Sequence, residues 1–184
     1  ETVGRNATLI LNCPPDKTGY LPEATVNRLQ DFGKLMRTRF KTDLAKTATI
    51  EVSETRTPGA NRNYSAANLT DDDKDTYWAT NDQTKSATIT FTWSTEQTLR
   101  YLQMMEYIKL GQRIKNWTVE YTTDGATWTR LAPSVQTTTV GYKRILPLNG
   151  STSSSYGKGF KATGLRITIV DSRACPLLSN ISIY

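Results

Sequence analysis

The stretch Ala87-Thr88-Ile89-Thr90-Phe91-Thr92-Trp93 alternates apolar residues and threonines without a break. Successive side chains of a β-strand point to opposite faces of its sheet, so this period of two places the apolar residues on one face and the threonines on the other. One face therefore packs on a core while the other meets solvent, as is typical of antiparallel sheets. The stretch predicts an antiparallel β domain.

Similar short patterns lie on both sides of this stretch. Residues 47–53 also alternate, with Ala48, Ile50 and Val52 facing one way. Downstream, Asp124-Gly125 separates two strand-like runs, which is the strongest short-range signal for a β-hairpin. About eight short strands with no helix between them predict a mainly β fold, an antiparallel jelly-roll β-sandwich. The further strands are expected within residues 99–110, 117–123, 127–131, 137–148, 165–170 and 178–184.

The N-terminal part has a different pattern. Residues 7–13 form a nearly continuous apolar run, as in a strand buried on both faces of a parallel sheet. After Pro14-Pro15, Leu21-Pro22-Glu23 opens a helix, because Pro and Glu suit a first helical turn. A strand and a helix cannot bury their apolar faces alone, so this unit needs either the following domain or a missing one. We expect two parts, residues 1–44 with the strand and helix and residues 45–184 with the sandwich.

The composition excludes several kinds of chemistry. The 184 residues contain no histidine, which removes Ser-His-Asp and Cys-His catalysis and imidazole zinc sites. The net charge is +6, but the basic residues are scattered, so we expect a solvated basic surface and no nucleic-acid site. No apolar run approaches the roughly 18 residues needed to span a bilayer. Cys13 and Cys175 lie in the two separate parts and are expected to be free thiols, with a disulfide between them as the alternative.

An acidic loop precedes the first strong strand signal. Asn68-Leu69-Thr70-Asp71-Asp72-Asp73-Lys74-Asp75-Thr76-Tyr77-Trp78 places four carboxylates within five residues. Like charges this close repel one another unless they are solvated or meet a cation. Two interpretations remain open: an oxygen-rich turn that holds a hard cation, and a solvated acidic loop before a strand.

The order Asp-x-Asp-x-x-Thr-x-Trp in residues 71–78 resembles the first loop of discoidin, or coagulation factor 5/8 type C, domains and of family 32 carbohydrate-binding modules. In that family the loop binds a structural calcium ion, or sodium in some members. The family usually has Gly where Asp72 stands, and a Glu near the C-terminus where this chain has Asn180. The resemblance implies ligands from the side chains of Asp71 and Thr76, from the carbonyls of Asn68, Asp73 and Thr76, and from the Ser179-Asn180 segment.

A second resemblance covers nearly the whole chain. Residues 6–15, 19–22 and 31–33 resemble the end of the catalytic barrel of α-L-fucosidases of glycoside hydrolase family 29, and residues 103–115, 139–144 and 171–176 resemble their C-terminal domains. It implies the last strand and helix of a (β/α)8 barrel followed by a discoidin-like sandwich, that is, a C-terminal fragment. The family's catalytic carboxylates lie on earlier segments, and retaining hydrolysis needs two carboxylates that flank the bond. We therefore expect no catalytic residue here and no activity of the fragment alone.

The resemblances imply a module that binds carbohydrate, a fucosylated or galactosylated glycan, for its parent enzyme. Two other functions stay open: a structural domain that packs on the catalytic barrel, and an adhesion domain, which the lack of obvious exposed apolar residues disfavours. Trp78, Trp93 and Trp117 are expected in the core. Arg113 and Arg173 are candidates for sugar binding, but each can also form a surface ion pair with Glu106 or Asp171. The candidates for sugar binding are Glu106, Tyr107, Arg113, Tyr142 and Arg173.

The resemblance also implies a secreted or periplasmic location. Sequons for N-glycosylation occur, but those at Asn6 and Asn180 lie in or beside expected strands, where a glycan is awkward. A threonine-rich chain produces such sequons by chance. We expect them to be unused, which fits a bacterial source.

Overall fold

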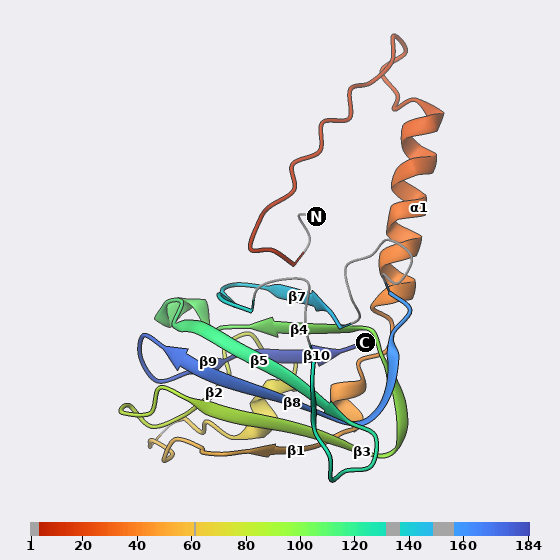
Figure 1. The fold of residues 1–184 in the computed structure, drawn as a ribbon. Helices are drawn as coiled ribbons and strands as arrows, with labels where there is room; N and C mark the ends of the chain where they lie inside the picture. Colours follow the sequence, from red (N-terminus) through yellow and green to blue (C-terminus); the bar gives the residue numbers. More distant parts are fainter. Residues whose placement is uncertain (1–3, 61, 132–136, 149–156) are drawn as a thin grey trace.

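The sandwich is built around two long antiparallel strands, β3 (Ala87–Leu99) and β8 (Phe160–Ser172) (Figure 1). This computed structural model describes residues 4–60, 62–131, 137–148 and 157–184. The five-stranded sheet has the order β1-β3-β8-β5-β6, a three-stranded sheet the order β10-β4-β7, and a small sheet pairs β2 with β9. The other strands are β1 (Thr49–Val52), β2 (Trp78–Ala79), β4 (Tyr101–Met105), β5 (Ile114–Thr122), β6 (Thr129–Arg130), β7 (Arg144–Pro147), β9 (Leu177–Leu178) and β10 (Asn180–Ile183).

The predicted antiparallel β-sandwich is confirmed, with ten strands among the described residues in place of about eight. The extra strands include β2 and β9, which are two residues long and too short to produce a readable period of two. The hairpin at Asp124-Gly125 forms between β5 and β6, and Gly125 takes the positive φ of 77° that such turns need. The predicted strand signal is thus reliable for long elements and weak for short ones.

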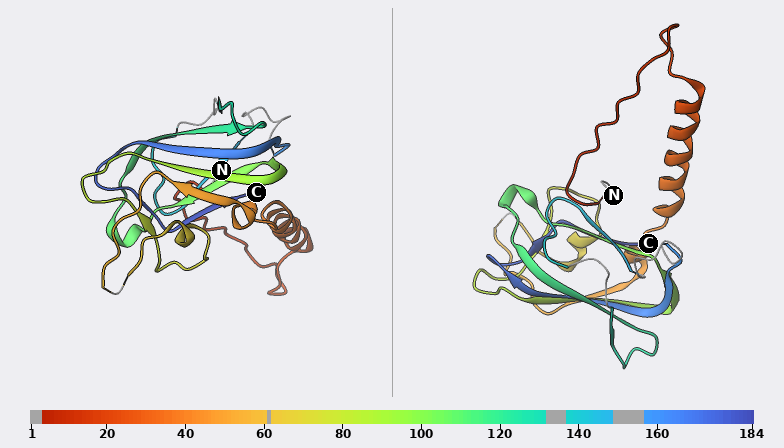
Figure 2. Two further views of the ribbon diagram at one scale, coloured as in Figure 1. Left: turned by 90° about the horizontal axis from the view of Figure 1, so that it is seen from below. Right: turned by 45° about the horizontal axis from the view of Figure 1, so that its top comes forward.

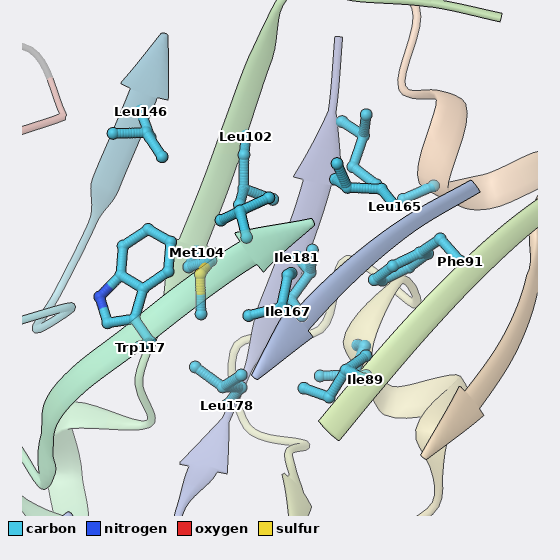
Figure 3. Close-up of a cluster of buried hydrophobic side chains, with 14 of the residues drawn as sticks. Ile89, Phe91, Leu102, Met104, Trp117, Leu146, Leu165, Ile167, Leu178 and Ile181 are labelled. Carbon is cyan, nitrogen blue, oxygen red and sulfur yellow. The ribbon is translucent and has the colours of Figure 1, made fainter. Parts of the chain in front are cut away.

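The core lies between the two larger sheets (Figure 3). The alternation of β3 holds as predicted: Ile89 and Phe91 are fully buried, whereas Thr88 and Thr90 face outward. The predicted core tryptophans are also buried, with exposed fractions of 0% for Trp78, 7% for Trp93 and 0% for Trp117. Figure 3 also labels other buried core residues, namely Leu102, Met104, Leu146, Leu165, Ile167, Leu178 and Ile181.

The expected strand at residues 7–13 does not form. This segment is extended but has no ladder partner, and Ile10 is 90% exposed. A strand needs a neighbour to satisfy its backbone N–H and C=O groups, and no element of the described chain lies beside it. The helix α1 (Glu23–Arg39) does form, yet none of its residues is buried. Figure 2 shows both segments projecting away from the sandwich.

Short contacts tie the ends of this N-terminal part to the sandwich. Asn6, at φ 57°, donates from Nδ2 to the carbonyl of Val140 at 2.8 Å, and its Oδ1 accepts from the backbone N–H of Lys143 at 2.8 Å. At the other end, Asp43 Oδ1 accepts from the backbone N–H groups of Ala45 (3.0 Å) and Ile183 (2.9 Å). Asp43 thereby caps the 3₁₀ helix η1 (Leu44–Thr47) and links it to the last strand.

Two further expectations concern the whole chain. Cys13 and Cys175 are both free thiols, as expected. No helix among the described residues is long and apolar enough to cross a membrane.

Replacing one aromatic residue in the sandwich and one in α1 tests whether the core lies in the sandwich while α1 is exposed. Phe91→Ala should lower the free energy of unfolding by about 3–5 kcal/mol, because it removes a fully buried ring from the core. Phe32→Ala is the matched control, since Phe32 on α1 is 45% exposed. This substitution should change the free energy of unfolding by less than about 0.5 kcal/mol. Urea denaturation followed by tryptophan fluorescence measures both. Equal losses in the two variants would contradict the described packing.

Candidate functional site

A cleft of about 160 Å³ opens at the end of the sandwich where β2 and β9 pair. Aromatic, basic and apolar side chains line it, and they come from loops that are far apart in the sequence. The loop after β1 contributes Arg56 and Tyr64, and the segment before β5 contributes Arg113. The remaining lining residues are Tyr77, Ala79, Asp82, Leu110, Cys175 and Leu177.

A stack of three tyrosines forms one wall and its support. The ring centroids of Tyr64 and Tyr77 are 5.3 Å apart, and those of Tyr77 and Tyr107 are 4.5 Å apart and nearly parallel. Tyr77 and Tyr107 are 7% and 8% exposed, so they serve mainly as packing, while Tyr64 is only half buried. The Arg56 guanidinium lies over the Tyr64 ring at 5.6 Å from its centroid. The wall therefore offers an aromatic edge beside a fixed cation.

A polar network forms the other wall. Arg56 pairs with Asp82 in a bidentate manner, with an Nη2 to Oδ2 distance of 3.0 Å. This guanidinium holds the pKa of the Asp82 carboxyl below its usual value. Arg113 donates from Nη1 to the carbonyl of Cys175 at 3.1 Å and to its Sγ at 2.9 Å. Hydrogen-bond donors and one ionised carboxylate thus face the same small space.

Glu106, a predicted sugar ligand, lies behind this cleft and faces the backbone. It is 2% exposed. Its Oε1 accepts from the N–H groups of Arg113 (2.7 Å) and Ile114 (2.8 Å), and its Oε2 accepts from Gly141 (2.6 Å). A buried carboxylate needs such donors to offset its lost hydration. Glu106 therefore fixes the loop that carries Arg113 and leaves no oxygen for a ligand in this structure.

The other predicted sugar residues are divided among three places. Arg113 lines the cleft, and Tyr107 supports it from below through Tyr77. Arg173 is exposed, and its backbone N–H donates to the carbonyl of Arg113 at 2.8 Å. Tyr142 is 54% exposed and lines a different cavity, together with Asn180. Neither predicted ion pair forms, since Asp171 pairs with Lys115.

Sequence reasoning missed Arg56, Tyr64, Tyr77 and Asp82. These residues lie in loops, where no periodicity marks which side chains face the same space. Leu110, which lines the cleft, and the nearby Ile108 are 47% and 43% exposed on the 3₁₀ helix η3 (Ile108–Leu110). The sequence shows no obvious exposed apolar residues, but these two are exposed, because a single helical turn cannot bury all of its faces.

The acidic loop brings together the oxygens of Asp71, Asp73 and Thr76. Thr76 Oγ1 donates to Asp71 Oδ2 at 2.6 Å and lies 3.2 Å from the carbonyl oxygen of Asp73. The amide of Asn68 braces the same loop by donating to the carbonyl of Tyr77 at 3.0 Å. Among the described residues, no three acidic, Cys or His side chains converge as in a metal site. The Asp71 carboxylate and the Asp73 carbonyl are oxygens of the kind that calcium takes.

Lysines from neighbouring elements neutralise part of this loop. Lys46 pairs with Asp72, and Lys109 pairs with Asp75. The Lys109 ammonium holds the pKa of the Asp75 carboxyl below its usual value. Asp72 adopts a φ of 62°, a conformation that Gly takes more readily, so the family's usual Gly has a physical reason.

Ser179 and Asn180 lie beside the loop with their side chains engaged in other bonds. Asn180 Oδ1 accepts from Gln103 Nε2 at 3.1 Å and from Ser182 Oγ at 3.0 Å, and its Nδ2 donates to the carbonyl of Leu69 at 3.4 Å. Ser179 Oγ donates to the carbonyl of Met105 at 3.4 Å. The amide of Asn180 thus links β10 to the loop directly, whereas a Glu at this position would add a negative charge.

Comparison with known proteins identifies relatives of the whole chain. Residues 49–178 match the model of the F5/8 type C domain family. Alpha-L-fucosidase 1 of Arabidopsis thaliana is 28% identical over 186 residues, which cover all of this chain and 34% of that protein. A GH29 fucosidase from Ruminococcus gnavus, solved in complex with fucose, is 35% identical with a TM-score of 0.81, and the match covers all of this chain and 34% of that one. The chain thus spans about a third of the length of the curated relatives it matches, in their C-terminal portion.

A more distant structure shares the fold alone. Chitosan-binding module 1 from a chitosanase/glucanase of Paenibacillus sp. IK-5 is 16% identical, with a TM-score of 0.58. The match covers 78% of this chain and 98% of the module. The fold of the sandwich is therefore shared with that carbohydrate-binding module.

Glu106 provides a test of how the cleft is held. Glu106→Gln should lower the free energy of unfolding by about 2–3 kcal/mol, because an amide nitrogen would then face backbone donors in a buried site. Amide hydrogen exchange at Arg113, Ile114 and Gly141 should become faster as well. Glu23→Gln on the exposed start of α1 is the control and should have little effect. A Glu106→Gln variant as stable as the control would show that the carboxylate is not structural.

Proposed function

The chain belongs to the F5/8 type C domain family, and we propose that it serves an α-L-fucosidase as a non-catalytic carbohydrate-binding module. The cleft lined by Arg56, Tyr64, Asp82 and Arg113 carries this proposal. Sugar sites combine an aromatic or apolar wall for the C–H faces of the ring with a few fixed polar groups for its hydroxyls. Both parts are present here within one small space.

The size of the cleft favours a terminal sugar unit over a chain. Sites for drug-sized ligands have volumes of about 300–1,000 Å³, whereas this cleft has about 160 Å³. Leu110 supplies exposed apolar surface to the cleft, and the Arg56–Asp82 pair offers donors and acceptors side by side. Fucosylated and galactosylated glycans, which the family resemblance implies, are the ligands that we propose.

The cleft is suited to binding and not to glycoside hydrolysis. Asp82 is the one carboxylate among its described lining residues, and it is already paired with Arg56. Retaining hydrolysis needs two carboxylates about 5–5.5 Å apart. We propose that hydrolysis of fucosides belongs to another part of the complete protein and that this part acts in a secreted or periplasmic setting.

A structural role is the second candidate, and a separate observation favours it. α1 exposes Leu29 (36%), Phe32 (45%) and Leu35 (43%), and the extended segment before it exposes Leu9, Ile10 and Leu11. Apolar surface of this kind is stabilised when a partner covers it. The catalytic barrel of a parent enzyme would be that partner, with the sandwich packed beside it and no ligand needed.

We further propose that the acidic loop holds a structural calcium or sodium ion. The side chains of Asp71 and Thr76 and the carbonyls of Asn68, Asp73 and Thr76 would be its ligands, supported by the observed proximity of the Asp71, Asp73 and Thr76 oxygens. The ion would stiffen the loop that ends in Tyr77, and Tyr77 forms part of the cleft wall. Its role would be to stabilise this loop, with no contact to sugar.

Calorimetric titration with L-fucose, galactose and 2′-fucosyllactose tests the sugar site. Tyr64→Ala and Asp82→Asn should each weaken binding about 10-fold or more, because one removes the aromatic edge and the other a charged acceptor. Tyr142→Ala is the control, since Tyr142 lines another cavity. Affinity should be constant from about pH 5 to 8, since the chain lacks histidine and the lowered pKa keeps Asp82 ionised. No heat with any sugar, or an equal loss in Tyr142→Ala, would refute this assignment.

Thermal unfolding with and without calcium tests the metal proposal. About 10 mM calcium, above the millimolar dissociation constants of many extracellular calcium sites, should raise the melting temperature, because an ion that binds only the folded chain stabilises it. Asp71→Asn should abolish the rise. Asp75→Asn is the matched control in the same loop, because Asp75 pairs with Lys109. Absence of a rise with either calcium or sodium in the wild-type chain would contradict the proposal.

A further inference from the structure

The outer face of the five-stranded sheet contains a second, larger hollow. An open groove of about 390 Å³ runs over β1, β3, β8 and β5. None of its described lining residues also lines the cleft beside Tyr64 and Tyr77. Its lining residues are Glu51, Val52, Ser53, Thr88, Thr90, Glu120, Arg166 and Thr168.

The strand register arranges these side chains in rows across the sheet. Glu51 lies opposite Thr90, Thr90 opposite Arg166, and Arg166 opposite Glu120, so one row crosses four strands. The next row pairs Thr88 with Thr168. Because neighbouring strands are about 4.8 Å apart, polar groups repeat at that spacing across the groove.

Arg166 is held in a fixed position within the first row. Its guanidinium carbon lies 3.8 Å from the centroid of the Trp128 ring, and its Nη1 lies 3.7 Å from Glu120 Oε2. Gly164 makes room for this ring on the sheet surface, since a Cβ there would come within 3.1 Å of Trp128 Cη2. The Arg166 side chain is still 31% exposed. A planar donor group is therefore oriented in advance and open to a ligand.

The chemistry of the groove selects a neutral partner rich in hydroxyl groups. Its charged residues are one arginine and two glutamates, so it has no strong attraction for a polyanion. Among its described lining residues, four carry hydroxyls and Val52 is the one aliphatic residue, which leaves little surface for a protein or a lipid. The partly exposed Trp128 ring beside Arg166 supplies the aromatic surface that the C–H face of a sugar ring needs. Vicinal hydroxyls of a sugar match an arginine that stands between a glutamate and a threonine, with further threonines in the next row.

We propose that this groove is a second carbohydrate-binding surface, for a neutral polysaccharide chain. Its open shape and its extent across four strands fit a chain that lies along the sheet, in contrast to the small cleft at the loop end. In Figure 1, α1 rises from the side of β7, β4 and β10, away from β1, β3 and β8. A partner that covers α1 therefore leaves the groove open, and a complete protein could hold both partners together.

Native affinity electrophoresis of the 184-residue chain tests this surface. The gels contain a soluble galactomannan, a mixed-linkage β-glucan or an arabinogalactan, with heparin as the polyanionic probe. Thr90→Val with Thr168→Val removes two hydroxyls at constant shape, and Arg166→Lys removes the planar donor. Each variant should weaken retardation by a neutral polysaccharide about 5- to 10-fold.

Thr92→Val is the matched control, because Thr92 lies on the outer side of the same strand and outside the groove. It should bind as the wild-type chain does, and so should Tyr64→Ala, which affects only the cleft. The proposal is overturned by no retardation in any neutral polysaccharide, by retardation in heparin alone, or by equal binding of the groove variants and Thr92→Val. Loss of binding in Tyr64→Ala alone would assign the polysaccharide to the cleft instead.

Discussion

The antiparallel pairing of β3 with β8 is the constraint on which the rest of the structure depends. The register from Ala87 opposite Ile169 to Thr92 opposite Gly164 fixes which side chains of both strands face inward. A slip by one residue would exchange the two faces, so the buried Ile89, Phe91 and Ile167 hold the register. The same register sets Thr90 beside Arg166 on the outer face. The core and the groove are therefore two sides of one pairing.

A single buried carboxylate has a similar importance at the loop end. Glu106 joins the segment before β5 to the turn at Gly141 through backbone N–H groups. Its side chain does not line the cleft. Arg113, which does line it, owes its place to these hydrogen bonds. Calcium at the acidic loop, if bound, would act in the same way on Tyr77. The cleft is thus shaped by groups that lie behind it, and its own side chains are held by the loops that these groups fix.

The sequence predicts what a repeating pattern encodes. The strict alternation in residues 87–93 and the turn at Asp124-Gly125 produced correct elements, because local sterics and burial determine both. Arg56 and Asp82 meet across 26 residues through irregular loops, so no local pattern marks the pair. The sequence predicts Glu106 as a sugar ligand, whereas the structure shows its carboxylate accepting from backbone N–H groups, a role that leaves no mark in the sequence. The apolar run at residues 7–13 has the composition of a strand but forms none, because a strand also needs a neighbour and none is present among the described residues.

The link between Asp43 and Ile183 has a consequence for folding in the cell. This hydrogen bond joins residues 140 positions apart, and β10 contributes the fully buried Ile181 and Ile183 to the core. Contacts between distant positions slow folding, because a long loop must close before they form. A ribosome adds about 5–20 residues per second and so exposes β1 to β9 for some time before β10 emerges. The sandwich can therefore close only after β10 has emerged, and until then its unpaired sheet edges need protection from aggregation.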